Sequence, residues 1–164
     1  MTKKIIISLT LLIFSYGVYA MSIKQCLFSE MTGVVSFEGK PAAGVKLVRM
    51  VNYDKDIYDE TITDESGNFH FPAIYHSSIL SKVLPMEFVV SQEITAHFQG
   101  KAYEVWNSVK RSPEVNTESR GKALVVECNL SWPEAKGIIV DDVAIFSRCN
   151  WDVEPDPDRN ISPF

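Results

Sequence analysis

The stretch MEFVVSQEITAHF, residues 86–98, decides the fold class because its apolar residues recur at every second position. Successive side chains of an extended strand point to opposite faces. One face then carries Phe88, Val90, Ile94, Ala96 and Phe98, and the other carries Ser91, Glu93, Thr95 and His97. We therefore expect a strand with one buried face and one solvent-exposed face.

The following residues predict a second strand folded back on the first. Residues 99–101, Gln-Gly-Lys, are short enough for a hairpin turn into residues 102–110. In that strand we expect an alternation, with Tyr103, Val105 and Val109 facing the core and Glu104 and Ser108 facing solvent.

The same short, alternating runs occur along most of the chain and predict an all-β protein. The further expected strands are residues 31–37, 44–51, 57–63, 69–71 and 122–130. In the last of these, Leu124, Val126, Cys128 and Leu130 share the inner face. We expect one antiparallel β-sandwich of about seven strands.

Two segments do not follow this pattern. Residues 75–84 are expected to form one or two helical turns that cross the sandwich. Residues 131–164 are a C-terminal extension, in which residues 137–146 are apolar enough to add a strand. Residues 152–164, rich in proline and acidic side chains, are expected to fray, so that the extension is partly disordered.

Four motifs resemble a known group of sandwich domains. They are Gly33-Val34-Val35, Gly39-Lys40-Pro41, Gly44-Val45 and the run TDESGNFHF at residues 63–71. Together they resemble the carboxypeptidase regulatory-like group of transthyretin-like domains. The resemblance implies a transthyretin-like (prealbumin-like) β-sandwich over residues 26–130 and almost nothing about activity.

A second resemblance extends over the same range. It rests on Leu27-Phe28-Ser29, Gln92-Glu93-Ile94, Trp106, Lys110, Glu118, Cys128 and Leu130. These residues look like a family of uncharacterised, mostly gammaproteobacterial exported proteins. Transthyretin-like enzymes of the hydroxyisourate hydrolase type carry a C-terminal Tyr-Arg-Gly-Ser motif, whereas this chain ends in NISPF at residues 160–164. We therefore do not expect hydroxyisourate hydrolase activity.

The first twenty residues, MTKKIIISLTLLIFSYGVYA, have the features of a secretory signal peptide. Lys3 and Lys4 precede an apolar run, and Val18-Tyr19-Ala20 is a small-x-small cleavage sequence. The apolar run from Ile5 to Phe14 is shorter than the ~20 residues that span a bilayer. We expect cleavage after Ala20 and a periplasmic or secreted product that does not span a membrane.

The charge of this product excludes one class of partner. Of 16 basic residues, 14 remain without Lys3 and Lys4, against 21 acidic residues, a formal charge of −7. No cluster of basic residues could neutralise successive phosphates. Nucleic-acid binding is not expected, and a basic partner is favoured.

Three cysteines, Cys26, Cys128 and Cys149, would enter an oxidising compartment. Cys128 with Cys149 is the preferred disulfide, because it closes a loop of about twenty residues and would stabilise the fold by roughly 3 kcal/mol. Connectivity is not fixed by spacing alone, so Cys26 paired with either of the others stays an alternative.

Candidate ligand sites are few. His70, His76 and His97 form no metal motif, and no cofactor motif or catalytic constellation occurs, so no metal, cofactor or catalytic residue is predicted. The acidic loop with Asp54, Asp56 and Asp59 leaves calcium binding as an alternative to a solvated loop.

The remaining candidates are binding residues. Trp106 and Trp151 could anchor a protein or stack on a sugar, although a covering segment would make Trp106 structural. Asp156 and Asp158 could dock a basic partner. We therefore expect a non-enzymatic protein-binding module, such as an immunity or adaptor protein that neutralises a toxin in the periplasm. The alternatives are an envelope- or carbohydrate-binding module and, less favoured, a hydrolase.

Overall fold

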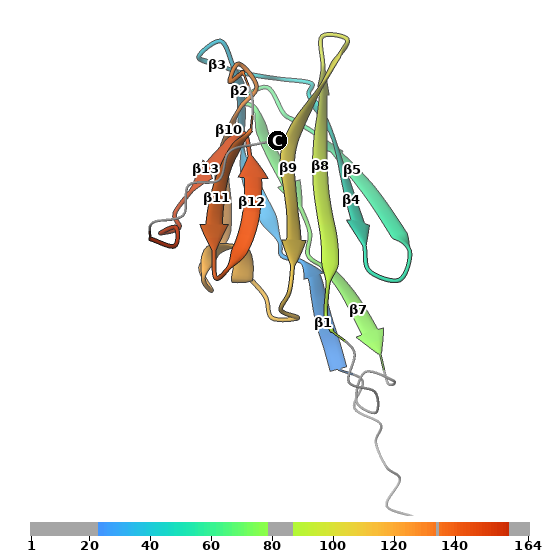
Figure 1. Ribbon diagram of the computed structural model, residues 1–164. Coiled ribbons are helices and arrows are strands. Elements are labelled where there is room, and N and C mark those ends of the chain that lie inside the picture. Colours follow the sequence, from blue (N-terminus) through green and yellow to red (C-terminus); the bar gives the residue numbers. More distant parts are fainter. Residues whose placement is uncertain (1–22, 79–86, 134, 158–164) are drawn as a thin grey trace, which may run out of the picture.

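The computed structural model describes residues 23–78, 87–133 and 135–157. The predicted signal peptide and Asp158 lie outside these residues. Within them, no helix is long and apolar enough to cross a membrane. The fold is all-β, as predicted, and two sheets face each other across one core (Figure 1).

The larger sheet has six strands in the order β11-β12-β9-β8-β4-β5, and all its pairings are antiparallel. Their bounds are β4 Lys46–Asn52, β5 Asp56–Ile62, β8 Val90–Phe98, β9 Lys101–Lys110, β11 Lys136–Val140 and β12 Val143–Ser147. The hairpin between β8 and β9 forms as predicted, because Gln99 and Gly100 both take positive φ angles, of 51° and 75°.

The smaller sheet contains β13, β10, β2, β3 and β6. Their bounds are β2 Met31–Phe37, β3 Lys40–Pro41, β6 Asn68–Phe71, β10 Leu124–Asn129 and β13 Cys149–Trp151. One pairing departs from the expected antiparallel arrangement, because β10 runs parallel to β2. At this pairing Gly33 allows a close approach, since a Cβ atom there would lie 2.3 Å from the carbonyl oxygen of Val126.

A two-stranded ribbon of β1 (Ile23–Phe28) and β7 (Ile74–Ser78) extends from one end of the sandwich (Figure 1). The helical turns expected over residues 75–84 are therefore wrong for residues 75–78, because β1 supplies an antiparallel partner for this segment. Residues 79–86 lie outside the described part of the chain.

The C-terminal extension is built into both sheets. Residues 136–147 form not one added strand but a hairpin of two, which pairs with β9, and the turn residues Asp141 and Asp142 have positive φ angles of 51° and 64°. The chain then crosses to the smaller sheet, where β13 pairs with β10. The Cys128–Cys149 disulfide joins these two strands as predicted, and Cys26 is a free, buried thiol.

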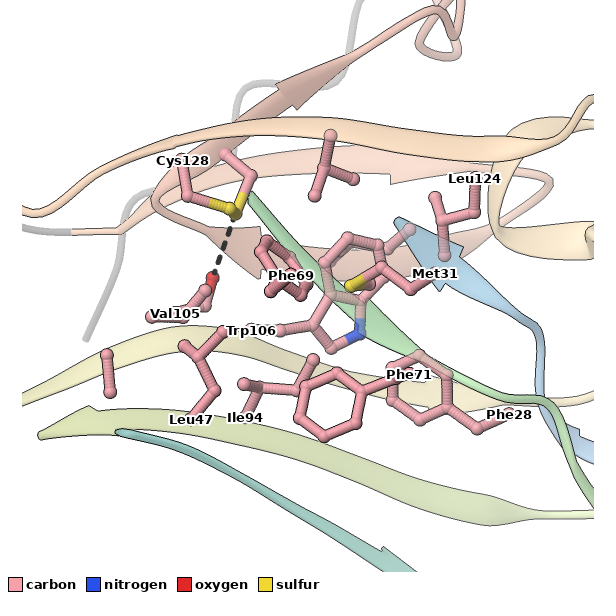
Figure 2. Packing of buried hydrophobic residues seen from close by; sticks show 14 of the residues in the cluster. Phe28, Met31, Leu47, Phe69, Phe71, Ile94, Val105, Trp106, Leu124 and Cys128 are labelled. Carbon is pink, nitrogen blue, oxygen red and sulfur yellow. Dashed lines mark hydrogen bonds between the residues drawn. A yellow bond between two sulfur atoms is a disulfide. The ribbon is translucent and has the colours of Figure 1, made fainter. Parts of the chain in front are cut away.

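The core lies between the sheets and is filled by aromatic and aliphatic side chains (Figure 2). The inner face predicted for residues 124–130 is confirmed, with Leu124, Val126, Cys128 and Leu130 all buried. The disulfide also lies in this core, where the Sγ atom of Cys149 is 3.9 Å from the carbonyl oxygen of Val105 (Figure 2).

Strand β9 departs from the simple alternation. A bulge opposite Ile94 and Thr95 leaves Val105 unpaired with β8, so Val105 and Trp106 are both buried. Beyond the bulge, Ser108 and Lys110 face inward, and the solvent exposure expected for Ser108 is wrong. The bulge therefore turns a lysine into the interior of the protein.

Candidate functional site

A cluster of buried polar side chains lies at the end of the sandwich where the ribbon joins it. We call Ser29, Gln92, Lys110 and Glu118 the buried polar cluster; all four are buried. Ser29 follows β1, Gln92 lies on β8, Lys110 ends β9, and Glu118 lies in a short 3-10 helix, Thr117–Ser119. The cluster thus joins the segment after β1 and strand β8 to Lys110 and Glu118, which are eight residues apart.

Glu118 is the centre of this cluster. Its carboxylate is 2.9 Å from the Lys110 Nζ atom and accepts hydrogen bonds from Ser29 Oγ at 2.7 Å and Gln92 Nε2 at 2.9 Å. Lys110 also donates to the Thr117 hydroxyl at 2.5 Å. Both members of the ion pair are almost fully enclosed, with side-chain exposures of 1% for Lys110 and 4% for Glu118.

The contacts of Glu118 determine its charge state. Burial is the largest single influence and raises the pKa of the carboxyl group, but the Lys110 ammonium and the hydrogen bonds from Gln92, Ser29 and Lys110 together outweigh it. The pKa of Glu118 therefore lies below its ordinary value. Glu118 is therefore a carboxylate at neutral pH and forms a salt bridge with Lys110.

This arrangement favours a structural role over a catalytic one. The Ser29 hydroxyl is fully buried and donates its proton to the Glu118 carboxylate, while it accepts a hydrogen bond from the Asn116 N–H at 2.7 Å. A nucleophilic serine needs substrate access and a base with enough proton affinity to take its proton. Ser29 is fully buried, and the lowered pKa of Glu118 makes this carboxylate a weak base. The buried polar cluster holds the end of β1 against β8, β9 and the loop that carries Glu118.

Cys26 lies beside the buried polar cluster. Its Sγ atom is 3.8 Å from the Ser29 hydroxyl oxygen. Burial raises the pKa of the Cys26 thiol above its ordinary value, although the hydrogen bond to Ser29 and the charge of Lys110 act in the opposite direction. A buried thiol with a raised pKa is a poor nucleophile.

A pocket of about 310 Å³ borders the buried polar cluster. It lies between the segment after β9 and the β11–β12 hairpin, and its lining includes Arg111, Ser112, Thr117, Glu118, Val140, Asp141, Val143 and Ile145. Its charged members are of both signs, so the pocket has no strong preference for an anion or a cation.

The two tryptophans predicted as binding residues pack against each other. Trp106 is fully buried, and the centroid of its ring lies 5.0 Å from that of Trp151. Trp151 is half-buried and donates a hydrogen bond to the carbonyl oxygen of Glu118 at 3.1 Å. Of the two alternatives for Trp106, the structural one therefore holds, because β13 covers it, and Trp151 is engaged in the same packing.

Asp156 is held within the molecule instead of extending into solvent. Its carboxylate pairs with Arg120 and accepts hydrogen bonds from the backbone N–H groups of Asp141 at 3.2 Å and Asp142 at 2.9 Å. These backbone bonds, led by that of Asp142, and the charge of Arg120 hold the pKa of Asp156 below its ordinary value. Asp156 therefore closes the β11–β12 turn, and its predicted role in docking a partner is not supported.

The acidic loop residues also have individual partners. Asp59 forms two hydrogen bonds, of 2.9 and 2.6 Å, to the fully buried guanidinium of Arg49, and Asp56 accepts one from Asn52 at 2.6 Å. No group of three or more histidine, cysteine or acidic side chains in the described part of the chain could hold a metal ion.

An exposed surface remains on the outer strand of the larger sheet. Asp56, Tyr58, Glu60 and Ile62 of β5 all point to its outer face, and we call them the edge patch. Tyr58 and Ile62 are 63% and 62% exposed, the two most exposed large hydrophobic side chains among the described residues. β5 pairs with β4 on one side and with no other described strand.

The surroundings of the edge patch are mainly acidic. Met50 of β4 lies opposite Tyr58 and next to Glu93 of β8 in the registers of the two strand pairs. Glu60 pairs with Lys46 at 2.7 Å, with both side chains about half exposed. Tyr58 and Ile62 are therefore two exposed apolar side chains with the carboxylates of Asp56 and Glu60 beside them on β5. Lys46 lies opposite Ile62, and Glu93 lies beyond Met50.

Sequence reasoning missed the buried polar cluster as a unit. Ser29, Gln92, Lys110 and Glu118 were singled out by a resemblance, but the polar loop and the alternation of β9 gave no sign that they meet. A sequence signal for the exposure of Tyr58 and Ile62 was present. They alternate with Ile57, Asp59 and Thr61 in a strand with acidic residues on both faces, so neither face is purely apolar.

Comparison with known proteins gives one match. A family model described as a domain of unknown function, DUF6795, matches residues 31–133, more than half of the chain. No curated protein and no solved structure matches significantly. The matched range contains the edge patch and all of the buried polar cluster except Ser29.

Proposed function

Since the chain belongs to the DUF6795 family, whose function is unknown, we propose from its own surface that it is a non-enzymatic protein-binding module. The observation that carries this proposal is the edge patch, where two large apolar side chains are exposed on an outer strand. Aromatic side chains such as Tyr58 are frequent anchors of protein interfaces.

The partner that fits this surface is a basic protein. Carboxylates border Tyr58 and Ile62, and removal of the predicted signal peptide gives a formal charge of −7. Complementary charge speeds the encounter of two proteins and discriminates against acidic competitors. A basic partner with an apolar contact surface would meet both features of the edge patch.

The proposal also covers the cellular compartment of the protein, the proteins that it resembles and its biological role. An N-terminal signal peptide would deliver the module to the periplasm or outside the cell. Its sequence motifs resemble carboxypeptidase regulatory-like, transthyretin-like sandwiches of exported gammaproteobacterial proteins. In that setting an acidic, disulfide-bonded module is suited to an immunity or adaptor role, in which it holds a basic toxin inactive.

Site-specific photo-crosslinking tests the proposal in the cells that produce the protein. A photoreactive phenylalanine analogue would replace Tyr58 in one variant and Val125 in the control. Val125 is 58% exposed and lies on β10, in the other sheet. We expect a discrete adduct with a basic protein from position 58 and none from position 125. The same adducts from both positions, or none from position 58, would contradict the proposal.

The purified partner then allows a quantitative test. Tyr58→Ala and Ile62→Ser should each weaken binding at least about tenfold, because the apolar contacts are lost. Val125→Ser should have no effect. Affinity should also fall as salt is added, because salt screens the charges around Tyr58 and Ile62. Binding that is insensitive to both substitutions and salt would remove the edge patch from consideration.

A further inference from the structure

A second surface, on the opposite sheet from the edge patch, has the chemistry of a ligand pocket. It has a volume of about 330 Å³ and is lined by Val34, Ser36, Glu127, Cys128, Asn129, Trp132 and Asn150. This volume is at the lower end of the ~300–1,000 Å³ range of small-molecule pockets. The pocket is therefore suited to a small ligand and not to a folded protein.

The floor of the pocket is rigid. Strands β2, β10 and β13 lie side by side there, and the Cys128–Cys149 disulfide ties the last two together. Ser36 donates a hydrogen bond to the carbonyl oxygen of Cys128 at 3.1 Å, and Asn129 accepts one from the N–H of Ser131 at 2.9 Å. Two of the polar side chains in the lining are thus held in fixed positions.

Two other polar side chains are free to bind a ligand. Glu127 and Asn150 face each other across β10 and β13, and both are exposed. Neither forms a hydrogen bond or ion pair with any other residue in the described ranges. They present a carboxylate, an amide oxygen and an amide N–H group at the same place on the sheet.

An aromatic ring completes the pocket. Trp132 is half-buried, and its backbone carbonyl accepts a hydrogen bond from the Arg148 guanidinium, which also donates to the carbonyl of Pro133 at 3.2 Å. The Lys136 ammonium lies 4.0 Å from the centroid of the indole. The segment that carries the ring is therefore anchored to the residue next to the disulfide.

From this geometry we propose that the pocket binds a neutral oligosaccharide. A sugar ring has an apolar face that stacks on an aromatic side chain, and its hydroxyl groups both donate and accept hydrogen bonds. Trp132 supplies the face of its indole that Lys136 does not cover, and Glu127 and Asn150 supply free polar partners beside it. The pocket lies on the smaller sheet, so this inference does not depend on protein binding at the edge patch.

The experiment uses the chain from residue 21 with its disulfide intact. Maltotriose, cellotriose and triacetylchitotriose are titrated in turn by isothermal calorimetry. We expect at least one trisaccharide to bind saturably in the micromolar to millimolar range, which is typical of small, weakly held ligands. No saturable binding of any of the three would overturn the proposal.

Variants locate the site. Trp132→Ala should weaken binding about tenfold or more, Trp132→Phe should retain part of the affinity, and Glu127→Gln should weaken binding by a smaller factor. Tyr58→Ala is the matched control and should bind sugar as the parent does. Urea unfolding curves show that each variant is folded. Unchanged affinity in Trp132→Ala would place any sugar elsewhere and overturn the proposal.

Discussion

Replacement of Lys110 by methionine provides the sharpest test of the buried polar cluster. The substitution keeps much of the side-chain volume but removes the charge that faces Glu118 at 2.9 Å. Glu118, with a side-chain exposure of 4%, would retain its hydrogen bonds from Ser29 and Gln92 but lose its counter-charge. Removal of one partner from a buried ion pair costs about 3–5 kcal/mol.

That loss is large relative to the total stability of a domain, about 5–15 kcal/mol. With a urea dependence of about 1–3 kcal/mol per molar, the midpoint of unfolding should fall by one molar or more. Fluorescence of the core residue Trp106 can monitor the transition. The double variant with Glu118→Gln should be more stable than the sum of the single effects predicts, because it leaves no unpaired charge.

The pH dependence separates this effect from a simple packing defect. In the parent protein the pKa of Glu118 is lowered, so its contribution to stability is present above the ordinary value of 4.5 and is lost as pH falls through the folded-state pKa. Without Lys110, burial should instead raise the pKa of Glu118. The carboxylate is then destabilising at neutral pH, and the deficit shrinks as acid protonates it. A deficit below about 1 kcal/mol, or one that does not vary with pH, would refute the reasoning.

Three further predictions concern the framework of the sandwich. Replacement of both Cys128 and Cys149 by serine should lower the free energy of unfolding by about 3 kcal/mol in urea titrations. The parent protein in reducing agent should show a similar loss. Equal urea midpoints with and without reductant would contradict this prediction. Gly33→Ala should cost at least about 2 kcal/mol, because its Cβ atom would lie 2.3 Å from the carbonyl oxygen of Val126. A thermal midpoint within a degree or two of the parent would show that the strands can separate. Arg49→Lys should lower the free energy of unfolding by about 2 kcal/mol, since a lysine cannot reproduce the two parallel hydrogen bonds from this fully buried guanidinium to Asp59. An unchanged free energy of unfolding would contradict this structural role of Arg49.

The sequence was sufficient for features that depend on local patterns. The period-two alternation of residues 86–98 predicted a half-buried strand, and Gln99-Gly100 predicted the hairpin, because each signal lies within a few residues of the structure that it specifies. Cys128 with Cys149 was the preferred disulfide on loop closure, but pairing with Cys26 stayed open until the structure joined Cys128 to Cys149 and left Cys26 free. The all-β class followed from the repetition of such short signals along the chain.

Other features depend on partners that are distant in sequence. The bulge in β9 shifts the alternation by one residue and so buries Trp106, Ser108 and Lys110, all three of which would face outward in a regular strand with Val105 inside. Glu118 lies in a segment that reads as a polar loop. Its burial depends on Ser29 and Gln92, which are 89 and 26 residues away, as well as on Lys110. A buried charge needs its counter-charge, and that pairing is a property of the assembled sheets.

In the C-terminal extension, too, local composition and tertiary packing give different answers. Its composition, with prolines and acidic residues, indicated a solvated tail that could dock a partner. The tertiary structure instead uses Asp156 to close the β11–β12 turn and β13 to cover Trp106. Local sequence therefore determined the strands and turns of this protein. The packing of the two sheets decided which polar and aromatic residues remain exposed, because exposure is set by whichever segment covers each side chain.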